Sequence, residues 1–320
     1  MGVNVNTLGK FGLRGATLLF ATLMNAAHAA PLKSEVVSQG HAHEALFSVN
    51  ANADGLIAVG GAGQISTSKD GSTWQRVNIG LAGRSLLAVS EVGGNAIAVG
   101  QQGAIVRRNG EKWEEQKSPT KERLFAVAQD GNGFVIASGG FGTLIRSLDS
   151  GKSWQKLTID WPALIGQSYE PHVYNVTLDA RGRAYMAGEF GMIARSEDRG
   201  ETWQALNSGD ESLFGLAFGE RDLAYAVGQS GTILRSQDGG ETWSQIESGS
   251  DAILLDVSIR SDDRAVVTGI REALSIDVGA SHAERLDNDQ LLGSWYCDVG
   301  VYKGDFYVVG QQANVLKLSI

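Results

Sequence analysis

The sequence repeats at intervals of about 40 residues, and this period limits the possible folds more than any other feature. Its landmark is two apolar or small residues followed by glycine, preceded by an apolar run such as Leu213–Leu216. The seven landmark glycines are Gly60, Gly100, Gly139, Gly188, Gly228, Gly269 and Gly310. The one long interval, which ends at Gly188, contains an insertion at Asp160–His172. A spacing near 40 residues is typical of a four-stranded propeller blade.

Most repeats also contain the unit Ser-x-Asp-x-Gly-x-Thr-Trp or a variant of it, and Ser236–Trp243 is the clearest copy. Serine and aspartate oxygens can accept bonds from nearby backbone N–H groups and hold a tight turn. Glycine can adopt a positive φ in that turn, and the apolar face of tryptophan must be buried. We therefore assign structural roles, and not catalytic ones, to these aspartates and tryptophans: Asp70, Trp74, Asp149, Trp154, Asp198, Trp203, Asp238 and Trp243.

Each repeat predicts four short strands, which in the fifth repeat are Leu213–Phe218, Ala224–Gly228, Gly231–Arg235 and a strand that begins at Thr242. Seven such units without helices predict an all-β, seven-bladed β-propeller of four-stranded blades. An open β-solenoid is the alternative. The seventh repeat ends after its third strand, while Ser34–Ser38 resembles a fourth strand without a blade. We expect the N-terminal strand to complete the last blade and close the ring, because an unpaired edge would otherwise remain.

Residues 1–29 have the pattern of a secretory signal peptide. Lys10 and Arg14 precede a short apolar stretch, 16–24, and Ala27–Ala29 is an A-x-A cleavage site. A membrane anchor is the alternative, but the apolar stretch is short for a bilayer. We expect residues 30–320 to form a single propeller domain that is exported to the bacterial periplasm. The formal net charge of −9 makes nucleic acid a poor partner.

Cys297 is the only cysteine, which excludes an internal disulfide and a zinc site of the cysteine type. Its surroundings, 295–299, predict an inner strand in which it is a small buried apolar residue. His41 and His43 could share one face of a strand, but two histidines make an incomplete zinc site. We expect a plain loop there, no metal and no cofactor.

The Ser-x-Asp-x-Gly-x-Thr-Trp units resemble Asp-box repeats. Together with the apolar-apolar-Gly landmark and the leader, the chain resembles the photosystem II assembly and stability factor family and its relatives in non-photosynthetic bacteria. This resemblance implies a lumenal or periplasmic, non-enzymatic scaffold that binds a membrane-protein complex or its assembly intermediate. A monomer without direct membrane insertion is expected.

Two other function classes remain open. Asp-boxes also occur in sialidases and endoglucanases, so a glycoside hydrolase is an alternative, as is a module that binds an envelope polymer or small ligand. The sialidase resemblance requires an Arg-Ile-Pro motif, and none of the four prolines follows Arg-Ile. No pair of carboxylates stands out as an acid/base couple.

Arginine recurs at one position of the third strand, at Arg107, Arg146, Arg195 and Arg235. These side chains could form a basic band that receives an acidic partner. The alternative is that they pair with carboxylates of neighbouring turns, since surface ion pairs are common.

The predicted partner site lies where the insertion joins the third and fourth blades. Connections from fourth to first strands and from second to third strands leave a propeller on one face, opposite the Asp-box turns. Aromatic residues with an arginine at the edge match the composition of interface hot spots. The residues expected to gather there are Arg123, Phe141, Trp161, Tyr169, His172, Glu189 and Phe190. The alternative is that the insertion buries its own aromatic residues as a cap over the central channel.

Overall fold

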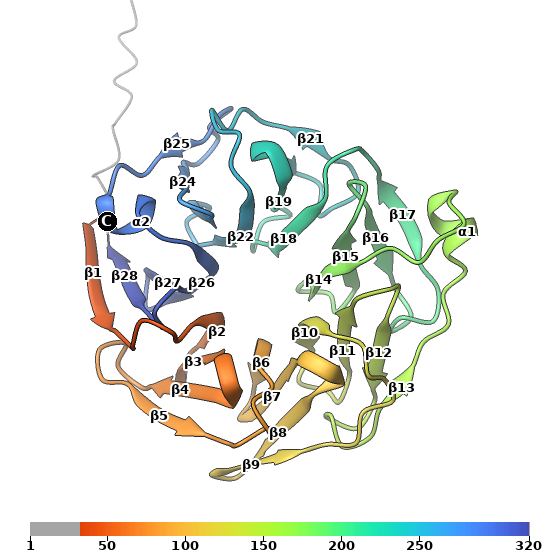
Figure 1. Cartoon of the computed structure of the whole chain (residues 1–320). Helices are drawn as coiled ribbons and strands as arrows, with labels where there is room; N and C mark the ends of the chain where they lie inside the picture. Colours follow the sequence, from red (N-terminus) through yellow and green to blue (C-terminus); the bar gives the residue numbers. More distant parts are fainter. Residues whose placement is uncertain (1–32, 320) are drawn as a thin grey trace, which may run out of the picture. The chain divides into compact units, whose positions relative to one another are not determined.

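A computed structural model describes residues 33–319 of the chain; the expected signal peptide lies outside the described residues. Seven four-stranded antiparallel sheets surround a central channel (Figure 1). The all-β, seven-bladed propeller expected from the repeats is confirmed. Within residues 33–319, no helix has the length and apolar character needed to cross a membrane.

We name the strands of each blade a to d, from the channel outward. Blade 1 contains β2 (Leu46–Asn52), β3 (Gly55–Gly60), β4 (Gln64–Ser68) and β5 (Gln75–Asn78). Blade 2 contains β6 (Leu86–Val92), β7 (Asn95–Gly100), β8 (Ile105–Asn109) and β9 (Lys112–Glu115). Blade 3 contains β10 (Leu124–Gln129), β11 (Val135–Gly139), β12 (Leu144–Ser147) and β13 (Gln155–Lys156). Blade 4 contains β14 (Val173–Leu178), β15 (Ala184–Gly188), β16 (Ile193–Ser196) and β17 (Gln204–Asn207).

The remaining blades follow the same order. Blade 5 contains β18 (Leu213–Phe218), β19 (Ala224–Gly228), β20 (Ile233–Ser236) and β21 (Ser244–Gln245). Blade 6 contains β22 (Leu254–Ile259), β23 (Ala265–Gly269), β24 (Ala273–Ile276) and β25 (Glu284–Arg285). Blade 7 contains β26 (Tyr296–Tyr302), β27 (Asp305–Gly310), β28 (Val315–Ser319) and, as strand d, β1 (Lys33–Ser38). Single 3₁₀ turns, η1 (Gly61–Gly63), η2 (Gln101–Gly103) and η3 (Gln229–Gly231), join strands b and c of blades 1, 2 and 5.

The ring closes through blade 7. Strand β1 pairs antiparallel with β28, with Glu35 opposite Lys317 and Val36 opposite Leu316. The expected closure by the N-terminal strand is therefore confirmed. The pairing joins segments from the two ends of the described chain and supplies the backbone partners that the outer edge of β28 would otherwise lack.

The core consists of separate apolar clusters between neighbouring blades. The described residues form seven clusters, one at each junction, and strand b of every blade contributes to the cluster on each side of it. Every residue of β19 is buried, for example, because the strand has a blade on each side. This explains why strand b is a continuous apolar run and not an alternating one.

The Asp-box turns are held by side-chain bonds to the backbone. In blade 5, Ser236 Oγ accepts from Gly240 N at 2.8 Å, and Asp238 Oδ1 accepts from Thr242 N at 2.9 Å. The bond from the Thr242 hydroxyl and that from its backbone lower the pKa of Asp238 to about 2. Thr242 was expected to begin strand d, but β21 begins at Ser244, because the threonine serves the turn.

Each turn packs against the preceding blade. Gly240 has a φ of +84°, and a Cβ there would lie 3.0 Å from the rings of Tyr185 and Phe218. Both the conformation and the space therefore require glycine. Trp243 Nε1 donates to the Gly240 carbonyl oxygen at 3.1 Å, which positions the indole over the junction between blades 4 and 5.

The repeated arginines connect blades and do not form a free basic band. Arg146 of blade 3 pairs with Glu201 in the turn of blade 4, and Arg195 of blade 4 pairs with Glu241 in the turn of blade 5. The other two arginines donate to main-chain oxygens of the next turns, Arg107 to Ser150 at 2.8 Å and Arg235 to Ala280 at 2.6 Å. The alternative of pairing with turn carboxylates therefore holds for Arg146 and Arg195, while Arg107 and Arg235 bind main-chain oxygens of the turns.

Two short helices were not expected. Helix α1 (Trp161–Ile165) forms in the insertion, where Asp160 accepts from Ala163 N as N-cap and Gly166 ends the helix in the left-handed conformation. Helix α2 (Asp289–Leu292) begins at the N-cap Asn288. These capping patterns are local signals that the repeat analysis did not weigh.

Deletion of residues 33–38 tests the closure. We expect the melting temperature, measured by circular dichroism, to fall by roughly 5–15 °C, because a loss of several kcal/mol corresponds to that shift in a domain of this size. A deletion variant that melts with the wild-type protein would contradict the closure as a source of stability.

Candidate functional site

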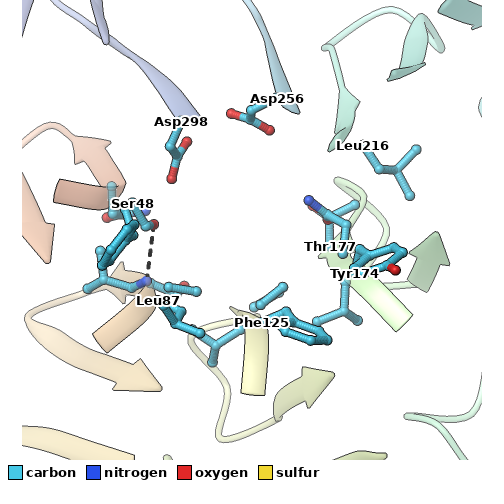
Figure 2. A pocket seen from close by; sticks show the side chains of 18 of the residues that line it. Ser48, Leu87, Phe125, Tyr174, Thr177, Leu216, Asp256 and Asp298 are labelled. Carbon is cyan, nitrogen blue, oxygen red and sulfur yellow. Dashed lines mark hydrogen bonds between the residues drawn. The ribbon is translucent and has the colours of Figure 1, made fainter. Parts of the chain in front are cut away.

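The channel is a cavity of about 520 Å³ lined by strand a of every blade (Figure 2). The a–b pairing of each blade shifts register at the second residue of strand a, which marks a β-bulge. The bulge residues are Phe47, Leu87, Phe125, Tyr174, Phe214, Leu255 and Cys297. Because a bulge re-aims side chains, a mostly apolar ring of residues lines the channel.

Cys297 is one of these channel residues. It is half-buried in β26, where its sulfur lies 3.3 Å from the carbonyl oxygen of Leu46. Loss of water, followed by the negative charges of Asp298 and Asp256, raises the pKa of the thiol well above its ordinary value. The expected inner strand is present, but the side chain lines the cavity and is not enclosed in a blade core.

Two carboxyl groups meet on the channel wall, at the third position of strand a in blades 6 and 7. Figure 2 shows Asp256 and Asp298 as neighbours on the wall of the cavity. Desolvation raises the pKa of both, and the charge of Asp298 adds to the rise at Asp256. The pKa of Asp256 therefore lies well above its ordinary value of 3.8. Sequence analysis did not single out these two residues, which lie 42 positions apart in the chain.

The same carboxyl groups also join blades. Asp298 Oδ2 accepts from Val49 N of blade 1 at 2.9 Å, and Asp256 Oδ2 accepts from Val299 N of blade 7 at 3.0 Å. In the same way, Ser48 Oγ of blade 1 accepts from Val89 N of blade 2. These bonds connect innermost strands that have no β-ladder between them, at the junctions next to the closing blade.

The top face, opposite the Asp-box turns, carries the d–a connections and the b–c turns. In blade 3 the backbone N–H of Gly140, in the b–c turn, donates to the carbonyl oxygen of Arg123, at the end of the d–a connection. Blades 1, 2, 4, 5, 6 and 7 make the equivalent bond. The two kinds of connection therefore lie together at one end of each blade.

Five of the predicted partner-binding residues gather on the top face of blades 3 and 4. His172 Nδ1 accepts from Phe141 N at 3.0 Å, and the two rings lie 4.8 Å apart. Glu189 accepts from His172 N at 2.8 Å, and Tyr169 packs on Phe190 with ring centroids 5.4 Å apart. The insertion and the two b–c turns thus form one continuous surface.

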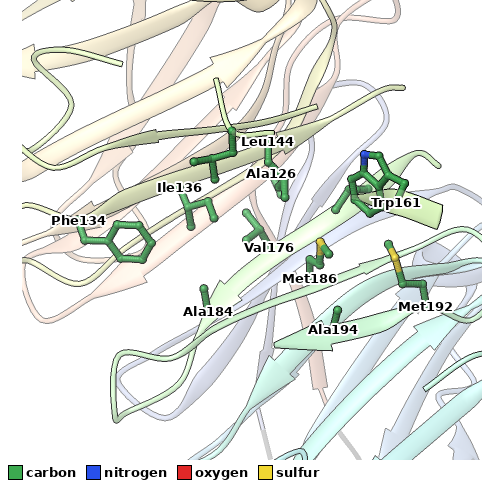
Figure 3. Close-up of a cluster of buried hydrophobic side chains, with 12 residues drawn as sticks. Ala126, Phe134, Ile136, Leu144, Trp161, Val176, Ala184, Met186, Met192 and Ala194 are labelled. Atoms are coloured by element: carbon green, nitrogen blue, oxygen red, sulfur yellow. The ribbon is translucent and has the colours of Figure 1, made fainter. Parts of the chain in front are cut away.

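Trp161 was expected in this exposed group but is buried, with 4% of its surface exposed. It packs with the cluster between blades 3 and 4, near Met192 and Leu144 (Figure 3). A Cβ on Gly142 would lie 2.4 Å from its indole nitrogen, so the ring fits against a bare backbone. Helix α1 lies at the outer rim of the ring in Figure 1, so the insertion does not cap the channel.

The aromatic surface continues to the channel through residues that sequence reasoning did not assign. Phe125 and Tyr174 lie 6.2 and 5.9 Å from His172, and Phe214 lies 4.8 Å from Tyr174. All three occupy the bulge position of strand a. Alignment of the seven repeats at that position would have revealed them, because the other bulge residues are also mostly large and apolar.

Phe141 and Phe190 are held in an unusual backbone conformation. Their φ angles are +52° and +58°, and their side chains are 61% and 51% exposed. The equivalent residues of the other blades also have positive φ: Ala62, Gln102, Ser230, Arg271 and Gln312. A left-handed conformation costs a non-glycine residue about 1–2 kcal/mol. The turn imposes this conformational cost. The rings of Phe141 and Phe190 are exposed, so their burial offsets little of it.

A groove with both apolar and polar walls adjoins Phe190. It has a volume of about 760 Å³ and lies between helix α1 and strand β17. Its walls include Leu164, Met192 and Leu206, with Glu189 and Asp210 at the same site. Among residues 33–319, no three His, Cys, Asp or Glu side chains are grouped so that they could hold a metal ion.

No protein-family model matches the sequence, and no curated protein matches it. Solved structures do share the architecture. A structure of YCF48 bound to D1 peptide has a TM-score of 0.71 at 16% identity, covering 92% of this chain and 96% of that one. YCF48 from Cyanidioschyzon merolae also gives 0.71 and 16%, with 89% and 98% covered. The likeness shows the fold alone.

Lyases have the same fold. A catalytically inactive virginiamycin B lyase from Staphylococcus aureus with quinupristin has a TM-score of 0.77 at 12% identity, covering 90% of this chain and 99% of that chain. A streptogramin B lyase gives 0.76 at 13%. Binding proteins and enzymes therefore occur together among the structural neighbours.

The acid pair predicts an unusual pH dependence. Because Asp256 has a raised pKa, its contribution to stability is present below the ordinary value of 3.8 and is lost as pH rises through the raised value. Asp256→Asn does not titrate, keeps an acceptor for Val299 N and can donate to Asp298. We expect the melting temperature of this variant to equal or exceed that of the wild type near pH 8.

The difference should shrink as pH falls toward about 4, where Asp256 of the wild type is protonated. Asp54→Asn, on an exposed bottom-face loop, is the matched control. An equal loss of stability at every pH in Asp256→Asn would contradict a raised pKa at Asp256.

Proposed function

We propose that the protein is an exported, monomeric, non-enzymatic scaffold that binds a segment of a partner polypeptide on its top face. The leader pattern supports export to the periplasm, and the family resemblance extends the role to the assembly of a membrane-protein complex. A YCF48 structure with D1 peptide offers a precedent for this fold holding a peptide.

The exposed aromatic residues in left-handed turns carry this proposal. Glycine would fit the φ of +52° at Phe141 and of +58° at Phe190 without cost, yet both positions hold large apolar rings. The positive φ is common to this turn in all seven blades, so the feature that distinguishes blades 3 and 4 is the large exposed ring and not the strain. The rings stand on neighbouring blades of a soluble propeller domain, where an exposed apolar surface usually marks a contact site.

An enzyme is the second candidate, and the acid pair in the channel is the observation that favours it. A protonated carboxyl beside a carboxylate can serve as an acid/base couple. The inter-blade bonds of Asp256 and Asp298 account for the pair without catalysis, which favours the scaffold. Turnover of sialoside, glucan or streptogramin substrates that disappears in Asp256→Asn would establish the enzyme.

Phe141→Gly and Phe190→Gly separate binding from folding. We expect the free energy of unfolding, measured by urea denaturation, to stay within about 1 kcal/mol of the wild type, since relief of the left-handed strain offsets the lost contacts. Partner binding should be lost. A large fall in stability would instead assign these rings a structural role.

Photo-crosslinking in the native host can identify the partner. A benzophenone amino acid at position 141 or 190 should form a defined adduct with one envelope protein, identified by mass spectrometry. Leu148 is the matched control, because it is 52% exposed but lies in an Asp-box turn on the bottom face. Adducts that are absent at all three positions, or equal at position 148, would contradict a top-face partner site.

A further inference from the structure

One connection of the top face carries unpaired positive charge. The connection before blade 3 holds Lys117, Lys121 and Arg123, all exposed, and only one acid, Glu122. None of these side chains has an ion-pair partner within residues 33–319. By contrast, Arg84 in the preceding connection is paired with Glu115.

The connection before blade 5 carries unpaired negative charge. Asp210 is exposed and Glu211 is half-buried, and neither makes an ion pair with any residue from 33 to 319. Both are acids without a cation in the same connection, 208–212. The aromatic surface of blades 3 and 4 therefore lies between a basic and an acidic connection.

Hydrogen bonds and ring contacts join these three regions into one surface, which we call the top-face track: Arg123, Phe141, His172, Phe190 and Asp210. The turn of Phe141 bonds to the Arg123 carbonyl oxygen at one side and to His172 at the other. Gly209 N, next to Asp210, donates to the Phe190 carbonyl oxygen at 2.8 Å. Charge along the track therefore changes from positive, through aromatic, to negative.

The groove beside Phe190 contains an unsatisfied polar group. The hydroxyl of Tyr169 is buried and has no hydrogen-bond partner among the described residues. Loss of water, followed by the charge of Glu189, raises the pKa of this phenol, which keeps it protonated as a donor. Buried polar groups are normally satisfied, so a ligand group is a natural partner for this one.

Resting on the function proposed above, we propose that the top-face track binds an extended peptide of defined charge order. An acidic end lies toward Lys121 and Arg123, an apolar side chain enters the groove beside Phe190, and a basic end lies toward Asp210. A backbone carbonyl of the peptide accepts the Tyr169 hydroxyl. The partner is thus an acidic-apolar-basic segment of a protein.

Synthetic peptides test this charge order. Fluorescein-labelled peptides of about 12 residues, which extend to roughly 40 Å, carry three acids at one end, Phe-Leu in the centre and three bases at the other. Both chain directions are made, since only one should fit. Controls of the same composition have alternating charges, or serine in place of Phe-Leu. Fluorescence anisotropy with the full propeller measures the dissociation constants.

Charge-neutralising variants locate each end of the peptide. Asp210→Asn with Glu211→Gln should weaken binding of the polarised peptide about twofold to thirtyfold, the combined range for two exposed ion pairs. The same change should not affect a peptide whose basic residues are replaced by serine. Lys121→Gln with Arg123→Gln should behave in the same way toward the acidic end. Asp54→Asn on the bottom face should change neither affinity.

Tyr169→Phe tests the groove separately. The hydroxyl has no partner in the free protein, so its removal should leave the melting temperature unchanged. It should weaken the polarised peptide several-fold through the lost hydrogen bond. Unchanged affinity would overturn the bond from Tyr169 to the peptide.

The outcomes separate this inference from the proposed function. Affinity for the polarised peptide that exceeds that of the alternating control and falls in both neutralised variants supports the charge order. Equal affinity for the two peptides, lost in Phe141→Gly and Phe190→Gly, would overturn the charge order while leaving the scaffold. If neither polarised peptide binds, the inference is overturned. Crosslinking at positions 141 and 190 would then test the proposed scaffold function on its own.

Discussion

The packing of each blade on its neighbour is the contact on which this structure depends. A single four-stranded sheet has two faces and can bury neither alone, so the apolar residues lie in seven clusters between blades. Strand b is buried along nearly its whole length in every blade for this reason. The closing strand β1 follows from the same requirement, since a ring without a complete seventh blade leaves an edge unpaired.

Polar side chains reinforce these junctions at two places, the Asp-box turns and the wall of the channel. On the bottom face, arginines of strand c reach the Asp-box turn of the next blade, as Arg195 reaches Glu241. At the channel, Asp256 and Asp298 accept backbone N–H groups of the following blade. Burial of the two acids in these inner junctions raises the pKa of both, and the nearby charge of Asp298 raises that of Asp256 further.

The turns on the two faces therefore differ in how much side-chain variation they accept. Asp-box turns on the bottom face are fixed by Ser and Asp bonds and by a glycine that has no room for a Cβ. The b–c turns of the top face keep a common backbone shape but accept many side chains at their exposed corner, from Ala62 to Phe190. Variation at that corner, together with the insertion between blades 3 and 4, makes the aromatic sector different from the rest of the ring.

The sequence determined the repeat, the blade count and the closure, because period, glycine landmarks and Asp-box units are local features that each blade repeats. It also placed Phe141, His172 and Phe190 on one face, since strand order fixes the end at which each connection emerges. Only the tertiary structure decided that Trp161 is buried and that Phe125, Tyr174 and Phe214 extend the surface to the channel. The proximity of Asp256 and Asp298 could likewise not be predicted, because residues 42 positions apart come together only when neighbouring blades pack side by side in the ring.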